Sequence, residues 1–233
     1  MKFLVLSDMH GNIPVLDTLD AEFHAADAVL FAGDFAEFKR TETGSPALEA
    51  LCKKHETIFA VIGNCDEPDF LKELEKKDIS VENTLVYHEG LCFAGSGGGS
   101  KFTGTTPNER SDEELLADLD IVADTKDGTG ADGWNNLICI MHNPPKDTKC
   151  DAVNPSLHAG SPLLRKFIED QAPLAVVTGH IHEGAAVDTI NNTVIINPGA
   201  LADGRYAVLE VEKDAGSWKV TRAELKTAGR SPA

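Results

Sequence analysis

The sequence lacks the features that mark secreted, zinc-finger and membrane proteins. Its five cysteines are an odd number and include no Cys-x-x-Cys pair, which argues against a disulfide framework and a structural zinc site. No stretch approaches the roughly 18 consecutive apolar residues of a membrane-spanning helix. The opening run MKFLVLSD is interrupted by Asp8, which leaves it too short for a signal peptide. We therefore expect a cytoplasmic protein with no membrane association.

Basic residues are also in short supply. The chain has 21 Lys and Arg residues against 38 Asp and Glu residues, for a formal net charge of −17 at pH 7. A surface this acidic repels nucleic-acid phosphates, so we expect no stable binding to a nucleic-acid duplex. Bound metal ions would reverse the sign of the field locally, so a small anionic substrate would still be attracted.

The sequence does contain enough apolar residues for a real core. Hydrophobic residues make up 42% of the 233 positions, and no linker, repeat or low-complexity segment divides them, which predicts one domain over residues 1–233. Strand and helix patterns alternate through the first half, whereas the last quarter is mostly strand. This order predicts an α/β fold with parallel strands first, antiparallel hairpins afterwards and helices on the outside.

The individual elements follow from apolar patterning and turn residues. Strands are predicted over 2–7, 28–32, 57–62, 79–82, 84–88, 91–95, 137–141, 174–178, 184–189, 193–196, 206–212 and 217–224, and helices over 13–24, 46–55, 67–77, 112–124 and 162–171. Asn12 is predicted to cap the first helix, and Ser111 with Glu114 to form a capping box. Asn191 and Asn192 predict a turn, and residues 125–136 a loop rich in Gly and Asp.

Five short polar motifs each follow an apolar run. They are Asp8-Met9-His10, Gly33-Asp34, Gly63-Asn64-Cys65-Asp66, His142 and Gly179-His180-Ile181-His182, and the runs before them read FLVLS, AVLFA, IFAVI, LICIM and LAVVT. Such runs are typical of buried strands in a sheet covered on both faces. Polar residues at the carboxyl ends of these strands lie along one edge, where α/β proteins place their sites. Four imidazoles, several carboxylates and one amide form a ligand set for two metal ions rather than one.

Spacing within the motifs suggests which side chains act together. Alternate residues of an extended stretch share a side, which pairs Asp8 with His10 and His180 with His182. Asp34 stands alone after its strand and is the natural bridge between two ions. Asn64 offers a neutral oxygen ligand, and His142 completes the ligand set of the second ion. Each motif alone has a simpler interpretation, such as a turn, a capping histidine or a mononuclear zinc pair, but their joint occurrence favours the two-metal site.

Taken in order, these motifs resemble the signature of calcineurin-like metallophosphoesterases, and the resemblance extends to about residue 212. It implies an αββα sandwich of two mixed β-sheets flanked by helices, the metallo-dependent phosphatase fold. It also implies that Asp8, His10, Asp34 and His182 hold the first metal, and that Asp34, Asn64, His142 and His180 hold the second.

The resemblance further implies hydrolysis of a small anionic phosphate ester by in-line attack of a metal-bridging hydroxide. A phosphodiesterase is the first expectation, and a phosphomonoesterase or a non-catalytic metal-binding interaction protein on the same fold are the alternatives. Manganese is the first choice of metal, and iron, nickel, cobalt and zinc remain open because mixed nitrogen and oxygen ligands do not select among them. Whether the protein forms a homo-oligomer is left open.

The third motif departs from the family pattern. Many members carry histidine at the position of Cys65, where it contacts the phosphate and is thought to protonate the leaving oxygen. Cys65 can fill space, act as a weak donor, or serve as a thiolate ligand or nucleophile. Asp66 either orients a ligand or belongs to a turn. His158, in the loop 143–160, is a second candidate acid. The candidate catalytic residues are thus Asp34, Asn64, Cys65, Asp66 and His142.

Overall fold

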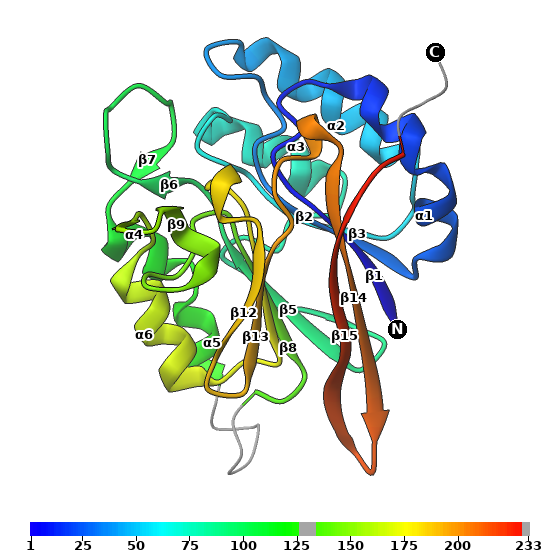
Figure 1. Ribbon diagram of the computed structural model, residues 1–233, viewed down its shortest axis with the longest axis vertical. Helices are drawn as coiled ribbons and strands as arrows, with labels where there is room; N and C mark the ends of the chain where they lie inside the picture. Colours follow the sequence, from blue (N-terminus) through cyan, green and yellow to red (C-terminus); the bar gives the residue numbers. More distant parts are fainter. Residues whose placement is uncertain (126–133, 230–233) are drawn as a thin grey trace.

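Two β-sheets lie face to face between two layers of helices in the computed structural model, which describes residues 1–125 and 134–229 (Figure 1). The first sheet has the strand order β15-β14-β1-β2-β3. Its strands are β1 (Lys2–Leu6), β2 (Ala28–Ala32), β3 (Ile58–Val61), β14 (Arg205–Asp214) and β15 (Ser217–Thr227). Strands β1, β2 and β3 are parallel, and the hairpin β14–β15 joins them antiparallel to β1.

The second sheet has the strand order β12-β13-β11-β8-β5-β4. Its strands are β4 (Val86–His88), β5 (Leu91–Ser96), β8 (Leu137–Met141), β11 (Ala175–Thr178), β12 (Ala186–Ile190) and β13 (Thr193–Asn197). The four central strands are parallel, and β4 and β12 form antiparallel edges. Two short pairs stand apart: β6 (Gly99–Ser100) with β7 (Glu109–Arg110), and β9 (Ala152–Asn154) with β10 (Leu157–His158).

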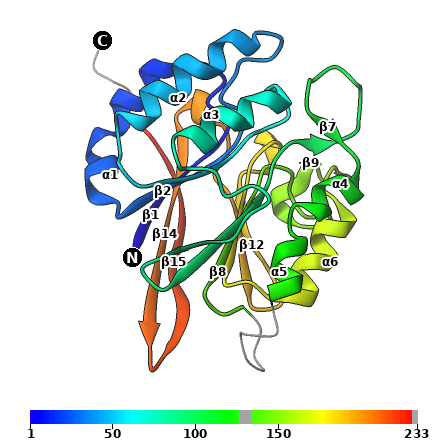
Figure 2. The same cartoon turned by 180° about the vertical axis from the view of Figure 1, so that it is seen from behind.

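Helices cover the outer face of each sheet, as the view from behind also shows (Figure 2). The first sheet is covered by α1 (Asp20–Ala25), α2 (Gly44–Cys52) and α3 (Leu71–Lys76), and the second by α4 (Asp112–Ala117), α5 (Asp120–Thr125) and α6 (Pro162–Gln171). Short 3-10 turns occupy Ile13–Leu19, Thr41–Thr43, Pro68–Phe70, Lys149–Asp151, His182–Gly184 and Leu201–Asp203. The predicted αββα sandwich is therefore confirmed.

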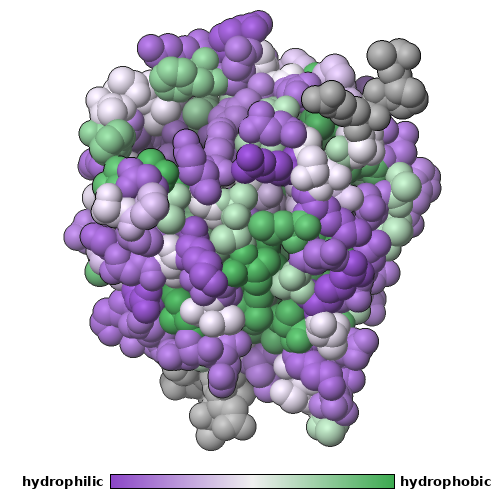
Figure 3. Space-filling model, viewed as in Figure 1, coloured by the Kyte–Doolittle hydropathy of each residue, from purple (hydrophilic) through white to green (hydrophobic). Residues whose placement is uncertain are grey.

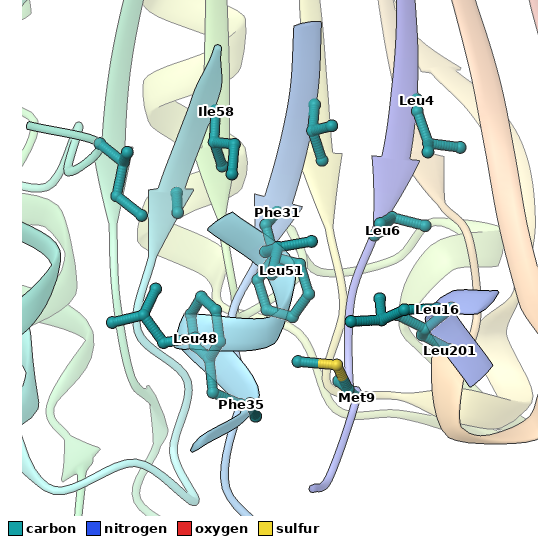
Figure 4. Packing of buried hydrophobic residues seen from close by; sticks show 14 of the residues in the cluster. Leu4, Leu6, Met9, Leu16, Phe31, Phe35, Leu48, Leu51, Ile58 and Leu201 are labelled. Atoms are coloured by element: carbon teal, nitrogen blue, oxygen red, sulfur yellow. The ribbon is translucent and has the colours of Figure 1, made fainter. Parts of the chain in front are cut away.

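Alternation along the strands separates the core into layers. On β1, Phe3 and Val5 pack between the two sheets, whereas Leu4 and Leu6 pack against the helices of the first layer. Side chains of a strand point alternately to its two faces, so a strand buried on both faces needs an unbroken apolar run. Figure 4 shows Leu4 and Leu6 in the outer layer, where they share the core with Phe31 and other residues of the strands and helices.

The first predicted helix differs from the structure. Residues Ile13–Leu19 form a 3-10 turn, and α-helix begins only with α1. The prediction that Asn12 caps this segment is wrong, because its side chain makes no capping hydrogen bond. Instead, Asn12 Nδ2 donates to the carbonyl oxygen of Ala202 at 2.9 Å. This tertiary contact to a distant turn orients the side-chain amide, and its oxygen does not accept the backbone N–H that a cap requires.

Other predicted elements are shortened or divided. The helix predicted over 112–124 is split into α4 and α5, although the capping box of Ser111 and Glu114 is confirmed. The strand predicted over 79–82 is reduced to single bridges at Ser80 and Glu82. Most of the loop predicted over 125–136 lies outside the described residues.

The surface agrees with the acidic composition. Figure 3 shows a largely hydrophilic face on which hydrophobic residues gather in a band between β12 and β15. Val187, Trp218, Val220 and Leu225 belong to the core between the sheets but are only partly buried, so this core reaches solvent where the two sheet edges meet. Within residues 1–125 and 134–229, no helix combines the length and the apolar character needed to cross a membrane.

Candidate metal centre

The five polar motifs lie where the parallel strands of both sheets end. Residues Asp8 and His10 follow β1, and Asp34 follows β2. Asn64 follows β3, while His142 and the pair His180 and His182 follow β8 and β11 of the other sheet. The structure brings these side chains together over one end of the sandwich, as the position of the motifs predicted. A cleft of about 400 Å³ opens over them.

One group of potential ligands comes from the two ends of the signature. Asp8, His10 and His182 each present a ligand atom within 4.8 Å of the other two. The Nε2 atoms of His10 and His182 are 3.2 Å apart, and His182 Nε2 lies 3.3 Å from Asp8 Oδ1. His182 is 172 positions from His10 in the sequence, and three ligand atoms at this separation in space are suited to hold one cation.

A second group surrounds Asp34. Its carboxylate lies 3.6 Å from His142 Nε2 and 3.8 Å from His10 Nε2. Asp34 takes part in two of the three potential ligand groups found among the described residues, one with Asp8 and His142 and one with His10 and Cys65. This shared position is the one that a bridging ligand requires.

His180 is held close to both groups. Its backbone N–H donates to the carboxylate of Asp8 at 3.1 Å, and its ring centroid is 5.2 Å from that of His142. Burial, followed by the neighbouring His142, lowers the pKa of His180 to about 4. The ring is therefore neutral at pH 7 and has a lone pair available for a metal.

The contact between His142 and Asn64 tests whether these residues fit a cation. His142 Nδ1–H donates to the carbonyl oxygen of Ala32 at 2.6 Å, so the neutral ring has no proton on Nε2. Burial lowers the pKa of His142 and keeps the ring neutral. Its bare Nε2 nevertheless lies 2.8 Å from Asn64 Oδ1, which is also an acceptor.

Two facing lone pairs at this distance repel each other unless a cation lies beside both. Two ligands bound at about 2.1 Å and at right angles to one another are roughly 3 Å apart, which matches the observed separation of Asn64 Oδ1 and His142 Nε2. His10 repeats the pattern, since its Nδ1 lies 3.1 Å from the carbonyl oxygen of Ala36 and its Nε2 faces His182. Nδ1–H bonds to backbone carbonyls are the usual support of metal-binding histidines. The residues fit a metal.

Two buried carboxylates meet at the centre. Burial and the nearby Asp8 charge raise the pKa of Asp34. Burial also acts to raise the pKa of Asp8, but the hydrogen bond with His182 and the surrounding imidazoles outweigh it, so the pKa of Asp8 lies below its usual range. The same hydrogen bond raises the pKa of His182. Adjacent buried carboxylates repel each other when both are ionised, and divalent cations between them would supply the positive charge that offsets this repulsion.

The backbone of the candidate ligands is strained. Asp8, His10, Asp34 and His180 have φ angles of 57°, 47°, 60° and 67°. Side-chain-bearing residues rarely adopt this left-handed region, and such residues cluster at functional sites. Asp8 and His10 do present ligand atoms to one group, as predicted, but the expectation that an extended stretch brings them to one side is wrong. Tight left-handed turns aim these side chains at the centre, and no local pattern indicated them.

Two glycines allow the loops to approach closely. A Cβ atom at Gly63 would overlap the Asp34 carboxylate, and one at Gly179 would overlap the side chains of Ser7 and Asp8. Any larger residue at either position would displace a candidate ligand, which explains why glycine precedes both Asn64 and His180.

Asp66 secures the loop that carries Asp34. Its buried carboxylate accepts four backbone N–H groups, from Asp34, Phe35, Ala36 and Gly63, at 2.8–3.2 Å. Of the two roles predicted from the sequence, this arrangement is closest to that of an orienting carboxylate, although it acts through the backbone of the Asp34 loop.

Cys65 is buried beside Asp34. Its backbone N–H donates to Asp34 Oδ1 at 2.7 Å, and its Sγ faces the group that includes His10. Burial, reinforced by the Asp34 charge, raises the pKa of the Cys65 thiol well above its usual range. In the absence of a metal the thiol is therefore protonated, as a space-filling residue or a weak donor would be.

Asn197 supports the site and was missed as a functional residue. Its Nδ2 donates to the carbonyl oxygens of Cys150 at 3.0 Å and Ile181 at 2.8 Å, which fixes the turn between His180 and His182. Asn197 stands at the end of the apolar run TVII in β13. The rule that identified the other motifs, a polar residue at the end of a buried strand, would have found it.

Comparisons with known proteins identify the family of this chain. Residues 1–184 match the model of the calcineurin-like phosphoesterase family. The uncharacterized protein MJ1162 of Methanocaldococcus jannaschii is 30% identical over 221 residues, which cover 92% of this chain and 94% of that protein. The chain belongs to the calcineurin-like phosphoesterase family, whose members are hydrolases that act on phosphate esters and use divalent metal ions.

Solved structures show the same fold. The protein TT1561 of Thermus thermophilus superposes with a TM-score of 0.72 at 19% identity, covering 98% of this chain and 99% of that one. A protein described as a novel archaeal phosphodiesterase superposes with a TM-score of 0.52 at 16% identity, covering 97% of this chain and 100% of that one.

Proposed function

We propose that this protein is a binuclear metal-dependent phosphoesterase, and specifically a phosphodiesterase. The observation that carries the proposal is the pair of facing acceptors, Asn64 Oδ1 and His142 Nε2, 2.8 Å apart beside the shared carboxylate of Asp34. Asp8, His10, Asp34 and His182 would hold one ion, and Asp34, Asn64, His142 and His180 the other. We further propose that residues 1–233 form one domain, because the ligands come from both sheets.

Divalent ions bound here would supply positive charge for the phosphate and activate water for attack. The chain itself orients the ligands through backbone carbonyls, and Asp66 fixes the loop of Asp34. Manganese remains the first choice, and iron, nickel, cobalt and zinc stay open because a ligand set that mixes oxygen and nitrogen does not select among them. Preference for diesters rests on Cys65, a poor proton donor where many relatives have histidine, and on the likeness to the archaeal phosphodiesterase.

A panel of substrates and metals tests the proposal. We expect the protein to hydrolyse aryl phosphodiesters faster than aryl monoesters in the presence of Mn²⁺, and 2′,3′-cyclic nucleotides, Ni²⁺ and Mg²⁺ complete the panel. Asn64→Ala should lower kcat/KM at least about 100-fold, since one metal loses a ligand. Asn136→Ala, at the opposite end of β8, is the matched control. Absence of turnover with every metal, in a preparation that binds metal, would favour the non-catalytic alternative.

Replacing Cys65 by histidine is expected to change the dependence on the leaving group. A thiol cannot carry positive charge and is a weaker donor than an imidazolium. Cys65→His should therefore accelerate hydrolysis most for substrates whose leaving groups have a high pKa, and least for nitrophenyl esters. The measurement is kcat/KM across a series of aryl diesters with graded leaving groups. An unchanged slope in that series would show that residue 65 does not assist departure.

A further inference from the structure

A second cavity, of about 450 Å³, adjoins the metal centre. Asn64, Thr106 and His180 line both this cavity and the cleft over the centre, so the two spaces adjoin and share part of their wall. Apart from Ile181, the rest of its wall comes from two loops, the one that forms β6 and β7 and the one that forms β9 and β10. Neither loop contributes a candidate metal ligand.

The first loop presents an exposed aromatic ring. Phe102 is 92% exposed, yet its loop is firmly held. The carboxylate of Glu109 accepts the backbone N–H groups of Phe102 at 2.7 Å and of Gly104 and Thr105 at 2.9 Å. These bonds lower the pKa of Glu109 to about 2, so the carboxylate remains ionised. The backbone that carries the ring is thus held beside the cavity.

The facing loop is built in the same way. It contributes Val153 and Leu157, and Leu157 is 51% exposed. Here the buried carboxylate of Asp151 accepts the N–H of Gly160 at 3.1 Å and lies 2.7 Å from Nδ1 of His158, which also lines the cavity. Two carboxylate-braced loops therefore present apolar side chains to one space beside the centre.

Exposed apolar side chains gather around this site. Among the described residues, the large hydrophobic side chains left exposed are Phe38, Tyr87, Phe102, Ile121 and Leu157. Three of these five line the two adjoining cavities: Phe102 and Leu157 the second cavity, and Phe38 the cleft. Exposed apolar surface beside a polar centre is typical of a ligand site in which polar groups orient an apolar ligand.

We propose that the second cavity binds an aromatic ester group of the substrate, with its ring against Phe102 and Leu157 and its phosphate toward Asn64 and His180. This rests on the proposed function, because the phosphate is placed by the metal centre. Among apolar groups, an aromatic one is expected to gain the most binding free energy here, since contact between its ring and that of Phe102 adds to the burial of apolar area. The bracing of both loops reduces the ordering cost of binding.

Equilibrium binding tests the inference without turnover. Phenylphosphonate and methylphosphonate share a phosphonate that is not hydrolysed and differ in the ring. Titration calorimetry of the Mn²⁺-loaded protein should show phenylphosphonate binding at least about 10-fold more tightly. Phe102→Ala should reduce this ratio to about threefold or less, and Leu157→Ala should lower it in part.

Tyr87→Ala is the matched control, because Tyr87 is also an exposed aromatic residue, at 64%, but lies at the far end of the second sheet. It should leave the ratio unchanged. Since Phe102 buries little surface, its loss should leave the thermal unfolding midpoint unaltered, which separates binding from folding.

The possible failures are distinguishable. Equal affinity for the two phosphonates, or a preference that survives Phe102→Ala, would overturn the aromatic subsite while aryl diester hydrolysis by the wild type still supports the proposed function. Failure of the metal-loaded protein to bind either phosphonate, together with absence of diester hydrolysis, would overturn both.

Discussion

Asp34→Ala is expected to lower kcat/KM for an aryl phosphodiester by at least about 1,000-fold and to reduce the bound metal from two ions per chain to one or none. Asp34 is the carboxylate that belongs to two ligand groups, so its removal weakens both. A loss of about 4 kcal/mol in transition-state stabilisation, typical when metal charge is lost, corresponds to this factor. Steady-state kinetics and elemental analysis of the dialysed protein are the measurements.

The Asp34→Ala substitution should affect catalysis and metal binding and leave the stability of the fold largely unchanged. Removing Asp34 also removes a repulsive neighbour of Asp8, so the metal-free protein should not lose much stability. Asp34→Asn retains an oxygen for the N–H of Cys65 and should show the same loss of metal. Asp124→Ala, on the exposed face of α5, is the control. Retention of two ions by Asp34→Ala would rule out its role as the bridge.

Asp66→Ala is expected to destabilise the metal-free protein by about 3–5 kcal/mol. Four buried backbone N–H groups lose their acceptor, and an unsatisfied buried donor costs about 1–3 kcal/mol, part of which local relaxation and water recover. Metal affinity should fall as well, because the loop of Asp34 is no longer fixed. Denaturant unfolding gives the free energy, and titration with Mn²⁺ gives the affinity.

Asp66→Asn distinguishes positioning from direct chemistry. One oxygen of Asp66 accepts three of the four N–H groups, and the other accepts only that of Ala36. The oxygen of an asparagine can keep the three hydrogen bonds, and the bond from the N–H of Ala36 is lost. We therefore expect a smaller destabilisation of about 1–2 kcal/mol and partial activity. A normally stable Asp66→Asn variant with no activity would instead indicate that the carboxylate takes part in the reaction.

Much of the fold was predictable because its signals are local. The apolar runs before the motifs became β1, β2, β3, β8 and β11, within one or two residues of the predicted bounds. Burial of a strand on both faces requires such runs, and parallel strands bring their carboxyl ends to one edge. The same logic placed Asp8, His142 and His180 together although they are far apart in the sequence.

Local signals failed where a distant partner competed for a side chain or a turn. Asn12 had the right type and position for a cap, but its side chain is oriented by a hydrogen bond from Nδ2 to the carbonyl oxygen of Ala202. The four N–H groups around Asp66 and the carbonyls bound by Asn197 belong to loops up to 47 residues away. Spacing carries no information about such bonds, since they form only when strands distant in the sequence have paired within a sheet.

The sequence by itself determined which potential metal ligands the chain offers and the edge of the fold at which they lie, because residue type and apolar runs are written in it directly. The tertiary structure alone decided how these ligands are aimed and what lies beside them. Left-handed turns at Asp8, His10, Asp34 and His180 orient the centre. Two braced loops then place Phe102 and Leu157 against it, since only folding brings such loops together around a shared cavity.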